Sequence, residues 1–510
     1  MKITTTALFL LCLTLGASAE IRIWKDASGA HEIKAELVSV AGGKVTLKRE
    51  NGTLLTLAVS SLSKADQALL GGGASSSAGG APGDWPQWRG PGRDDVSKET
   101  GLLKKWPAGG PKRLWVNEEA GLGYSGFAVV GGKLYTMGLY DAEEKLICID
   151  TSTGKKLWET AVGPILKNGW GDGPRATPTV ANGMVYATNG TGEIICADAA
   201  SGKKIWEKSL TKDLGGKIQG WGYTESPLVD GDLVIVTPGG AQGAVAALDA
   251  KTGKVAWQTS DVTENAQYSS VIPITQGGER EYVQLLMNSI LGVSKTGKVL
   301  WKTEFPGKTA VIPTPIYSDG QVYVAAGYGV GCKSVKIGAG NAVEELYAST
   351  DMVNHHGGVI LVEGNLYGYN DKAGWTCMDF KTGAVKWTEK KALGKGAIHY
   401  ADGCFYLLEE KTGTVVLIKA SPKGWDEQGR FTLSPCPSGT FFVHIDGRTS
   451  PLSDRLLALP KSPANRRQRL VACGEIMPQE QTLHDMVMPP QIPLSQQRTV
   501  RLRRRPWCSY

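Results

Sequence analysis

The sequence predicts an all-β protein in which an eight-blade-type β-propeller, with seven full blades plus a lone outer strand, follows a small SH3-like barrel. Three observations predict this fold. Glycine supplies 66 of the 510 residues, and 41% hydrophobic with 21% charged residues is typical of a turn-rich globular protein. A motif ending in an aromatic residue recurs about every 45 residues, as expected for four-stranded blades. Short alternating segments separated by turns precede this repeat and indicate the barrel.

The first residues have the pattern of a secretory signal peptide. Lys2 precedes an apolar stretch at 7–15 and a small-residue cleavage site at 17–19, so residues 1–19 are expected to be removed. We therefore expect export to the periplasm or cell envelope. A lipid anchor attached at Cys12 is the alternative. No small residues directly precede Cys12, however, which favours export without an anchor. The remaining chain has no apolar run of membrane-spanning length, so we expect at most peripheral envelope association.

Residues 20–70 form the predicted barrel. Four alternating segments, RIWKD, HEIKAELVSV, KVTLKRE and TLLTLAV, are separated by turns that include Asn51-Gly52. Such turns supply the backbone angles of tight hairpins. Residues 71–83, GGGASSSAGGAPG, have the composition of a flexible linker.

The propeller is predicted over residues 84–433 from the aromatic repeat. The motif is clearest in TGKKLW, SGKKIW, TGKVAW, TGKVLW and TGAVKW, and degenerate copies fill the gaps between them. A large ring on an outer strand can cover the gap to the neighbouring blade, so the aromatic is interpreted as a docking residue. The docking residues are Trp115, Trp158, Trp206, Trp257, Trp301, Tyr347, Trp387 and Phe431.

A second signal is a glycine turn between two apolar alternating runs, as in ANGMVY and SDGQVY. It recurs at Gly132, Gly183, Gly231, Gly278, Gly320, Gly364 and Gly403. Each such turn indicates the inner hairpin of one blade. Because this signal occurs seven times and the docking aromatic eight times, we expect the ring to be unfinished.

Residues 434–510 differ from the rest of the chain. They carry eleven Lys or Arg, all but Lys461 being Arg, against five acids, which accounts for six of the seven net positive charges. The remaining chain is nearly neutral, so we expect no nucleic-acid partner. No alternating strand is predicted after Phe431, so this tail is expected to be disordered or out of frame and the strand at Trp115 to lack a neighbour.

Five cysteines belong to the repeat region: Cys148, Cys196, Cys332, Cys377 and Cys404. Cys148, Cys196 and Cys377 hold the same place in three repeats, among apolar strand residues. This placement favours small buried hydrophobes over a disulfide framework or a metal site.

Candidate binding residues come from loops expected at the mouth of the central channel, where concave groups of polar side chains are the default binding site. These loops contain GWGDGPR, GWGYTES, AQYSS, GYGVGC, NHHGG and GKGAIH. The candidates are Arg175, Tyr223, Glu225, Tyr268, Asn354, His355 and His399.

The two adjacent histidines at 355 and 356 do not predict a metal site. Neighbouring residues on a strand point to opposite faces, so both rings cannot face one ion. A contact between His355 and His399 across the channel mouth is a further hypothesis.

The units CIDTSTGKKLW, CADAASGKKIW and ALDAKTGKVAW resemble the tryptophan-docking repeat of propellers of the pyrroloquinoline quinone (PQQ) type. This superfamily includes PQQ-dependent alcohol dehydrogenases and cofactor-free proteins similar to BamB. The segment DWPQWRGPGRDDVSKETGLLKKWP, with NHHGGV and GAIHYADG, resembles an exported planctomycete-type subfamily. RIWKDASG, KVTLKRENG and LSKADQ resemble the Sla-type homology domain, which has an SH3-like barrel.

The resemblance implies a non-catalytic module that binds a protein partner or assists envelope assembly, with no cofactor, no metal and no catalytic residue. The alternative is a PQQ-dependent quinoprotein alcohol dehydrogenase with PQQ and calcium. That family uses a vicinal cysteine pair, which this sequence lacks, and a cluster of calcium ligands, which no acidic loop provides. Asp172 and Arg175 could imitate part of such a site.

Overall fold

The computed structural model describes residues 21–26, 31–41, 44–49, 51–58, 61–63, 66, 83–433, 444–446 and 455–458. The expected signal peptide, nearly all of the linker and most of the tail lie outside these residues.

The N-terminal unit is a four-stranded antiparallel sheet in the order β1-β2-β3-β4. Its strands are β1 (Ile21–Lys25), β2 (Glu32–Ala41), β3 (Lys44–Arg49) and β4 (Leu54–Ala58). Trp24, Val45 and Leu47 are buried in its core, and the Trp24 indole donates a hydrogen bond to the carbonyl of Ala35. The predicted alternating segments therefore form one sheet with an apolar face.

Within residues 83–433 seven blades follow, each with four antiparallel strands that are neighbours in chain order. The first three contain β7 (Phe127–Val130), β8 (Lys133–Tyr140), β9 (Glu143–Asp150), β10 (Lys156–Pro164), β11 (Thr179–Ala181), β12 (Met184–Thr188), β13 (Glu193–Asp198), β14 (Lys204–Ser209), β15 (Leu228–Asp230), β16 (Leu233–Val236), β17 (Ala246–Asp249) and β18 (Val255–Gln258). The next two contain β19 (Ile272–Gln276), β20 (Glu279–Leu285), β21 (Ser289–Ser294), β22 (Val299–Glu304), β23 (Ile316–Ser318), β24 (Gln321–Ala326), β25 (Gly331–Ile337), a 3₁₀ turn (Ala339–Asn341) and β26 (Val343–Ser349). The last two contain β27 (Val359–Val362), β28 (Asn365–Asn370), β29 (Gly374–Asp379), β30 (Val385–Glu389), β31 (Gly396–Ala401), β32 (Cys404–Glu409), β33 (Thr414–Lys419) and β34 (Glu427–Thr432).

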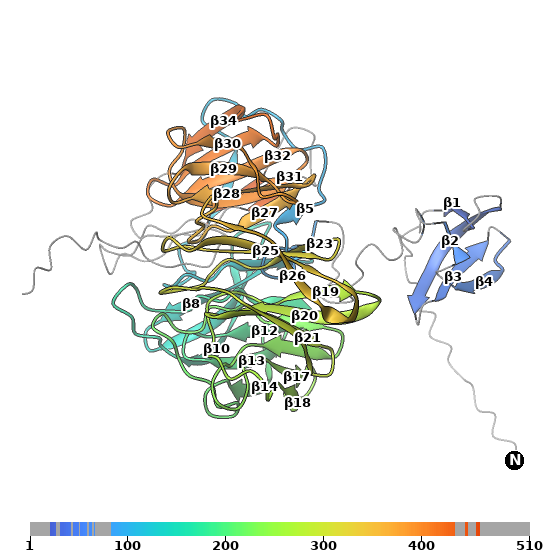
Figure 1. The fold of residues 1–510 in the computed structure, drawn as a ribbon, viewed down its shortest axis with the longest axis horizontal. Coiled ribbons are helices and arrows are strands. Elements are labelled where there is room, and N and C mark those ends of the chain that lie inside the picture. Colours follow the sequence, from blue (N-terminus) through green and yellow to red (C-terminus); the bar gives the residue numbers. More distant parts are fainter. Residues whose placement is uncertain are drawn as a thin grey trace, which may run out of the picture. The chain divides into compact units, whose positions relative to one another are not determined.

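The blades follow one another through the domain in chain order (Figure 1). Because the strands alternate in direction, the loops from the second to the third strand of a blade lie at the same end as the loops that lead to the next blade. We call this end the mouth end. At the other end, the first hairpin of a blade turns at positions such as Asn182 (φ 53°) and Gly183 (φ 76°), as the turn chemistry predicts.

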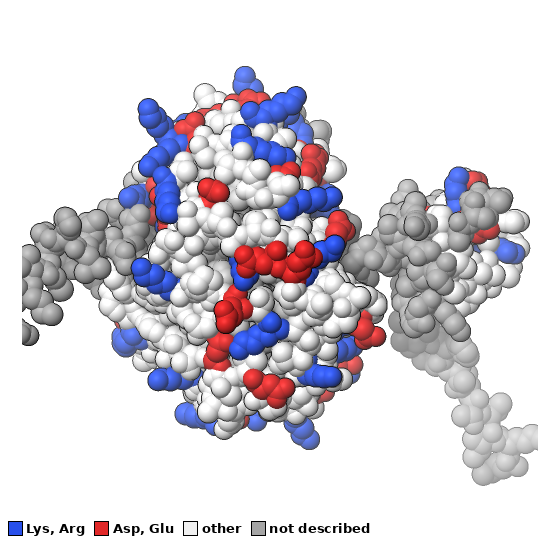
Figure 2. All heavy atoms as spheres, viewed as in Figure 1, with Lys and Arg blue, Asp and Glu red and all other residues white. Residues whose placement is uncertain are grey.

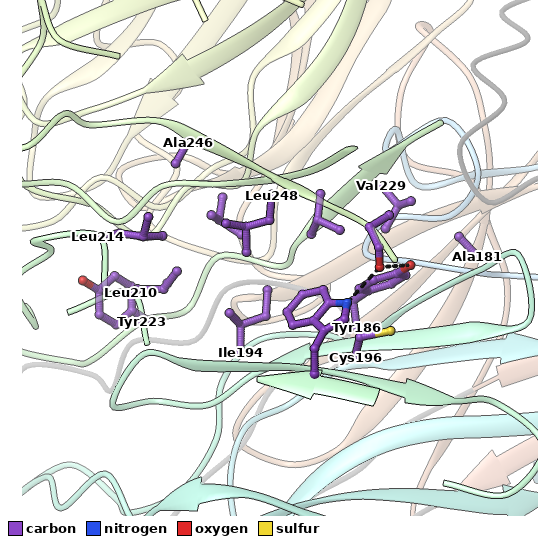
Figure 3. Packing of buried hydrophobic residues seen from close by; sticks show 14 of the residues in the cluster. Ala181, Tyr186, Ile194, Cys196, Leu210, Leu214, Tyr223, Val229, Ala246 and Leu248 are labelled. Atoms are coloured by element: carbon purple, nitrogen blue, oxygen red, sulfur yellow. Dashed lines mark hydrogen bonds between the residues drawn. The ribbon is translucent and has the colours of Figure 1, made fainter. Parts of the chain in front are cut away.

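Neighbouring blades pack face to face through apolar side chains. Between the second and third blades, Tyr186 and Ile194 face Val229 and Leu248 in one fully buried cluster (Figure 3). Cys196 belongs to this cluster. The five cysteines of the repeat region are all free and buried, as expected for small core residues.

The docking aromatics link each outer strand to the following blade. A Cβ added at Gly154, Gly202, Gly253, Gly297 or Gly383 would lie 2.5 to 2.8 Å from the ring of the preceding blade, so these glycines permit direct ring-on-backbone contact. Ring N–H or O–H groups also donate to carbonyls of the blade that follows each ring. The pairs are Trp115 with Thr151, Trp206 with Ala250, Trp257 with Lys295, Tyr347 with Phe380 and Trp387 with Ser421.

Two docking residues differ from this pattern. The indole of Trp301 donates to Glu281 and lies over Gly292, both in its own blade. The next blade lacks the TGK turn on which a ring could dock, because residues 338–342 form a different turn there. Phe431 packs on Gly110, which precedes the first blade, so the ends of the repeat region meet.

The expectation that the strand at Trp115 lacks a neighbour is wrong. This strand, β6 (Arg113–Val116), pairs with β36 (Arg455–Ala458), which in turn pairs with β35 (His444–Asp446). The pairing of β36 with β6 is parallel, whereas the four strands of each blade pair antiparallel throughout. Together with β6 these strands form a three-stranded sheet, which does not reproduce the four-stranded blade repeat.

Candidate functional site: the filled axis and the mouth-end loops

Residues 84–97, which we call the axial finger, lie among the first strands of all seven blades. The finger includes β5 (Val96–Ser97), which pairs in parallel with β31. Its contacts with the blades, in chain order, are Trp85 with Val129, Pro86 with Val180, Arg93 with Pro227, Arg93 with Val271, Trp88 with Thr314, Arg89 with Val359 and Asp95 with Tyr400. A segment that touches the first strand of each blade, or the residues just before that strand, must occupy the axis of the propeller.

Two arginines anchor the finger. Arg93 is 2% exposed and donates hydrogen bonds to the carbonyls of Ser226, Pro227 and Val271 and to the side chain of Gln87. Backbone carbonyls thus satisfy a buried charge that would otherwise be costly. Arg89 pairs with Asp95 at 3.0 Å, and both side chains are 1% exposed.

Glu225 is a buried carboxyl close to Arg93. It accepts hydrogen bonds from the backbone and hydroxyl of Thr237 and from the backbone of Val271. Burial raises the pKa of Glu225 to about 7, although these hydrogen bonds and the charge of Arg93 act in the opposite direction. Glu225 therefore holds the blades together at the axis and does not face an open channel mouth.

The mouth-end loops of the first three blades form a connected network. The guanidinium of Arg175 donates to the carbonyls of Gly171 and Gly173 and lies 5.0 Å from the ring centroid of Tyr124. Burial lowers the pKa of Arg175. Tyr268 packs edge-on against Trp221 at 5.6 Å. These contacts fix the backbone of the loops before β11 and β15.

The same loops expose two large apolar side chains. Trp170 is 43% exposed and Ile218 is 41% exposed. The backbone N–H of Trp170 donates to Asn168, its carbonyl accepts from the Tyr124 hydroxyl, and Asn168 also donates to the carbonyl of Gly220. An exposed indole on a backbone held this firmly is a feature of protein interfaces.

The mouth-end loops of the last three blades bring together charged and aromatic side chains. His356 is hydrogen-bonded to Glu410 at 2.5 Å, and Lys395 contacts both His355 at 3.0 Å and Asp371 at 2.8 Å. The rings of His355 and His356 lie 4.9 Å apart. The sequence interpretation placed these histidines on a strand, whereas they lie in the loop between β26 and β27, so the strand argument on their directions does not apply.

The sequence candidates fall into separate places. Arg175 and Tyr268 share the first network, Asn354 and His355 share the second, and the hydroxyl of Tyr223 donates to the carbonyl of Pro238 inside the core. The two histidines of the hypothesised contact have different neighbours. His399 packs on Trp85 at 4.7 Å and lies 3.9 Å from Asp95, whereas the ring of His355 packs against Tyr328 and His356.

Sequence reasoning missed the finger and the exposed Trp170. The finger carries a detectable signal, since DWPQWRGPGRDD combines aromatic and charged residues with glycine and proline and has no strand period. Its partners are mostly backbone carbonyls, which a sequence does not display.

Calcium-bound PQQ does not fit the residues at the axis. Among the described residues, no group of three or more His, Cys, Asp and Glu side chains could hold a metal ion. Asp172 accepts from the backbone of Asn168 and from Lys167, and Arg175 binds carbonyls of its own loop. At the axis, the carbonyls of Val359 and Val271 already accept hydrogen bonds from Arg89 and Arg93.

Charge and hydropathy add two further observations. On the face shown in Figure 2, acidic and basic side chains are intermixed and form no continuous basic stripe. Within the described part of the chain, no helix is long and apolar enough to cross a membrane.

Three of the solved structures to which this chain is similar are the following. The quinohemoprotein alcohol dehydrogenase of Comamonas testosteroni has 15% identity and a TM-score of 0.50, covering 70% of this chain and 74% of its own. BamB from Moraxella catarrhalis has 14% identity and a TM-score of 0.45, covering 61% and 88%. The designed protein Ika8 has 12% identity and a TM-score of 0.44, covering 63% and 93%. At such identities the likeness concerns the fold alone. No curated protein matches the chain.

Two family models match the sequence. The model of SLA1 homology domain 1 (SHD1) matches residues 15–72, which include the N-terminal sheet. The PQQ_2 model, described as outer membrane protein assembly factor BamB, matches residues 106–188 and 165–389, more than half of the chain. The chain therefore belongs to this family of PQQ/BamB-like β-propeller repeat proteins and carries an SHD1 domain ahead of its repeats.

Proposed function

We propose that this chain is an exported, non-catalytic scaffold that binds a protein partner at the mouth end of its propeller, in a BamB-like role in the periplasm or cell envelope of a planctomycete-type bacterium. The axial finger carries this proposal. It fills the axis, and its arginines occupy the carbonyls that a ligand there would need. Binding is therefore assigned to the loops and not to the channel.

The loops before β11 and β15 offer the best surface for a protein. Trp170 and Ile218 provide exposed apolar area on a backbone that hydrogen bonds already fix. Little conformational entropy is lost when a partner covers such a surface. Most of the free energy gained by burying the apolar side chains therefore contributes to the affinity. Aromatic anchors of this kind carry much of the binding free energy at interfaces.

The experiment uses the full chain, expressed in the bacterium that produces it, so that its partners in the cell envelope are present. A photo-crosslinking residue at position 218 is expected to trap one protein in good yield, and Trp170→Ala is expected to abolish that product. A crosslinker at Leu157 is the matched control, because Leu157 is 48% exposed but lies on the outer strand β10. Equal products from both positions would contradict the proposed surface.

The alternative, a PQQ-dependent alcohol dehydrogenase, is tested separately. The purified chain is incubated with PQQ and Ca²⁺, and dye reduction is followed with a panel of alcohols. Substantial alcohol-dependent reduction would overturn the scaffold proposal, whereas the scaffold proposal expects none above a blank without protein.

A further inference from the structure

The loop between β26 and β27 contains three consecutive buried side chains that each have one polar atom without a partner. Asn354, His355 and His356 are 0%, 7% and 1% exposed. Among the described residues, Asn354 Oδ1, His355 Nε2 and His356 Nδ1 have no hydrogen-bond partner. A buried polar atom left unpaired costs about 1–3 kcal/mol, so three in succession indicate a partner from outside the chain.

The neighbours of His355 determine what its free atom offers. The ammonium of Lys395 can only donate, so its contact with Nδ1 leaves the proton of His355 on Nε2. Burial, together with His356 and Lys395, lowers the pKa of His355 to about 2, so the ring is neutral. His355 Nε2 is therefore a hydrogen-bond donor without an acceptor.

The other two free atoms belong to Asn354 and His356. Burial alone would raise the pKa of Glu410, but the hydrogen bond and charge of His356 and the charge of Lys395 outweigh it and lower this pKa. The carboxylate of Glu410 is hydrogen-bonded to His356 Nε2, so Nδ1 is the ring atom of His356 that has no partner among the described residues. Asn354 donates through Nδ2 to Gly358 and Tyr369, which leaves its oxygen as an acceptor close to the donor of His355.

We propose that this loop binds a neutral hydroxylated molecule, such as a sugar or a sugar alcohol, through Asn354 and His355. A hydroxyl group both donates and accepts, so it can accept from His355 Nε2 and donate to Asn354 Oδ1, which are neighbours in the loop. An anion offers acceptors only, and it would face the carboxylates of Glu410 and Asp371. An ammonium offers donors only and would lie close to Lys395.

The surroundings of the loop support a ligand site. Tyr328 packs edge-on against His355 at 4.5 Å and has a φ of 55°, a strained conformation for a bulky residue that is found mainly at functional sites. Beneath the loop, a Cβ added at Gly358 would lie 3.3 Å from Nη1 of Arg89, so the axial finger supports the loop from below. This site is separate from the surface around Trp170, so either proposal can fail alone.

The test uses the full chain labelled with ¹⁵N-histidine. The chain has six histidines, so substitutions assign each ring signal. Three probes of matched size differ in charge: glucose, glucuronate and glucosamine, with mannitol as a second neutral probe. We expect saturable shifts of His355 and His356 with a neutral probe, a dissociation constant of about 1 mM or lower, and binding at least tenfold weaker for the charged probes.

Variants separate binding from folding. Asn354→Leu is expected to weaken binding of the neutral probe at least tenfold, and Tyr328→Gly, which relieves the strained φ, is expected to raise stability while weakening binding. His31→Asn, in the N-terminal sheet, should change neither. The absence of saturable shifts with both neutral probes would overturn the proposal and assign the free atoms to ordered water only. Equal binding of glucuronate would overturn it in favour of an anion site.

Discussion

Arg89 and Asp95 form an ion pair at the axis of the propeller, with the guanidinium nitrogen 3.0 Å from the carboxylate oxygen and both side chains 1% exposed. The two residues belong to the same finger, and Arg89 also donates to the carbonyl of Val359 in the sixth blade. The pair thus fixes the shape of the finger while the finger binds the blades.

We predict that Asp95→Asn strongly destabilises the propeller. Removing the carboxylate leaves the Arg89 charge buried without its partner, which typically costs about 3–5 kcal/mol. Urea unfolding followed by tryptophan fluorescence measures the change. The control is Glu207→Gln, which breaks an exposed pair with Lys204 and should cost less than about 1 kcal/mol. Equal, small effects from both substitutions would show that the axial pair does not support the fold.

A second prediction concerns the glycines under the docking rings. Gly253 has a φ of 70°, and a Cβ there would lie 2.8 Å from the ring of Trp206. Gly183 has a φ of 76° but nothing within 4 Å of the same position. Both substitutions to Ala incur backbone strain of about 1–2 kcal/mol, and only Gly253→Ala adds overpacking of about 1–3 kcal/mol. Thermal unfolding should therefore separate the two variants, and equal losses would contradict ring-on-glycine docking.

The outer strands and hairpin turns could be predicted because their signals are local. The TGK turn and the following tryptophan lie within a few residues of each other, so each copy is visible in the sequence. Trp301 shows the limit of this reasoning, since its docking depends on a turn in the next blade that differs there. The finger shows the same limit, because Arg93 binds carbonyls more than 130 residues away in the sequence.

The candidate site could be predicted only in part. Asn354 and His355 were selected because histidines and loops favour binding, and they lie together in the structure. The unpaired Nε2 of His355 follows from Lys395, which contacts the other ring nitrogen and comes from a different loop, so the sequence does not link the two residues. Glu225 was expected at the channel mouth, but the hydroxyl of Thr237 and the backbone of Val271 hold it in the core.

A third prediction follows from Glu225. Its pKa rises from an ordinary value of 4.5 to about 7 in the folded chain, so the folded state favours the protonated carboxyl. The associated stability is fully present below about pH 4.5 and is lost as the pH rises through about 7. The loss is about 3 kcal/mol at 1.36 kcal/mol per pKa unit. The free energy of unfolding of the Glu225→Gln variant should not fall in this way between about pH 4.5 and 7. Parallel pH profiles for the two proteins would contradict the raised pKa of Glu225.

The last prediction concerns β35 and β36, which extend the sheet at β6. A chain ending at Leu433 lacks β35 and β36, so β6 loses the strand with which it pairs. Trp115 keeps its hydrogen bond to Thr151 and its contact with Gly154, because both belong to the first blade. We therefore expect amide hydrogen exchange at 113–116 to accelerate at least tenfold, while β16 and β17 in the third blade remain protected. Unchanged exchange at 113–116 would mean that docking of Trp115 alone holds β6 and that its pairing with β36 contributes nothing to its protection.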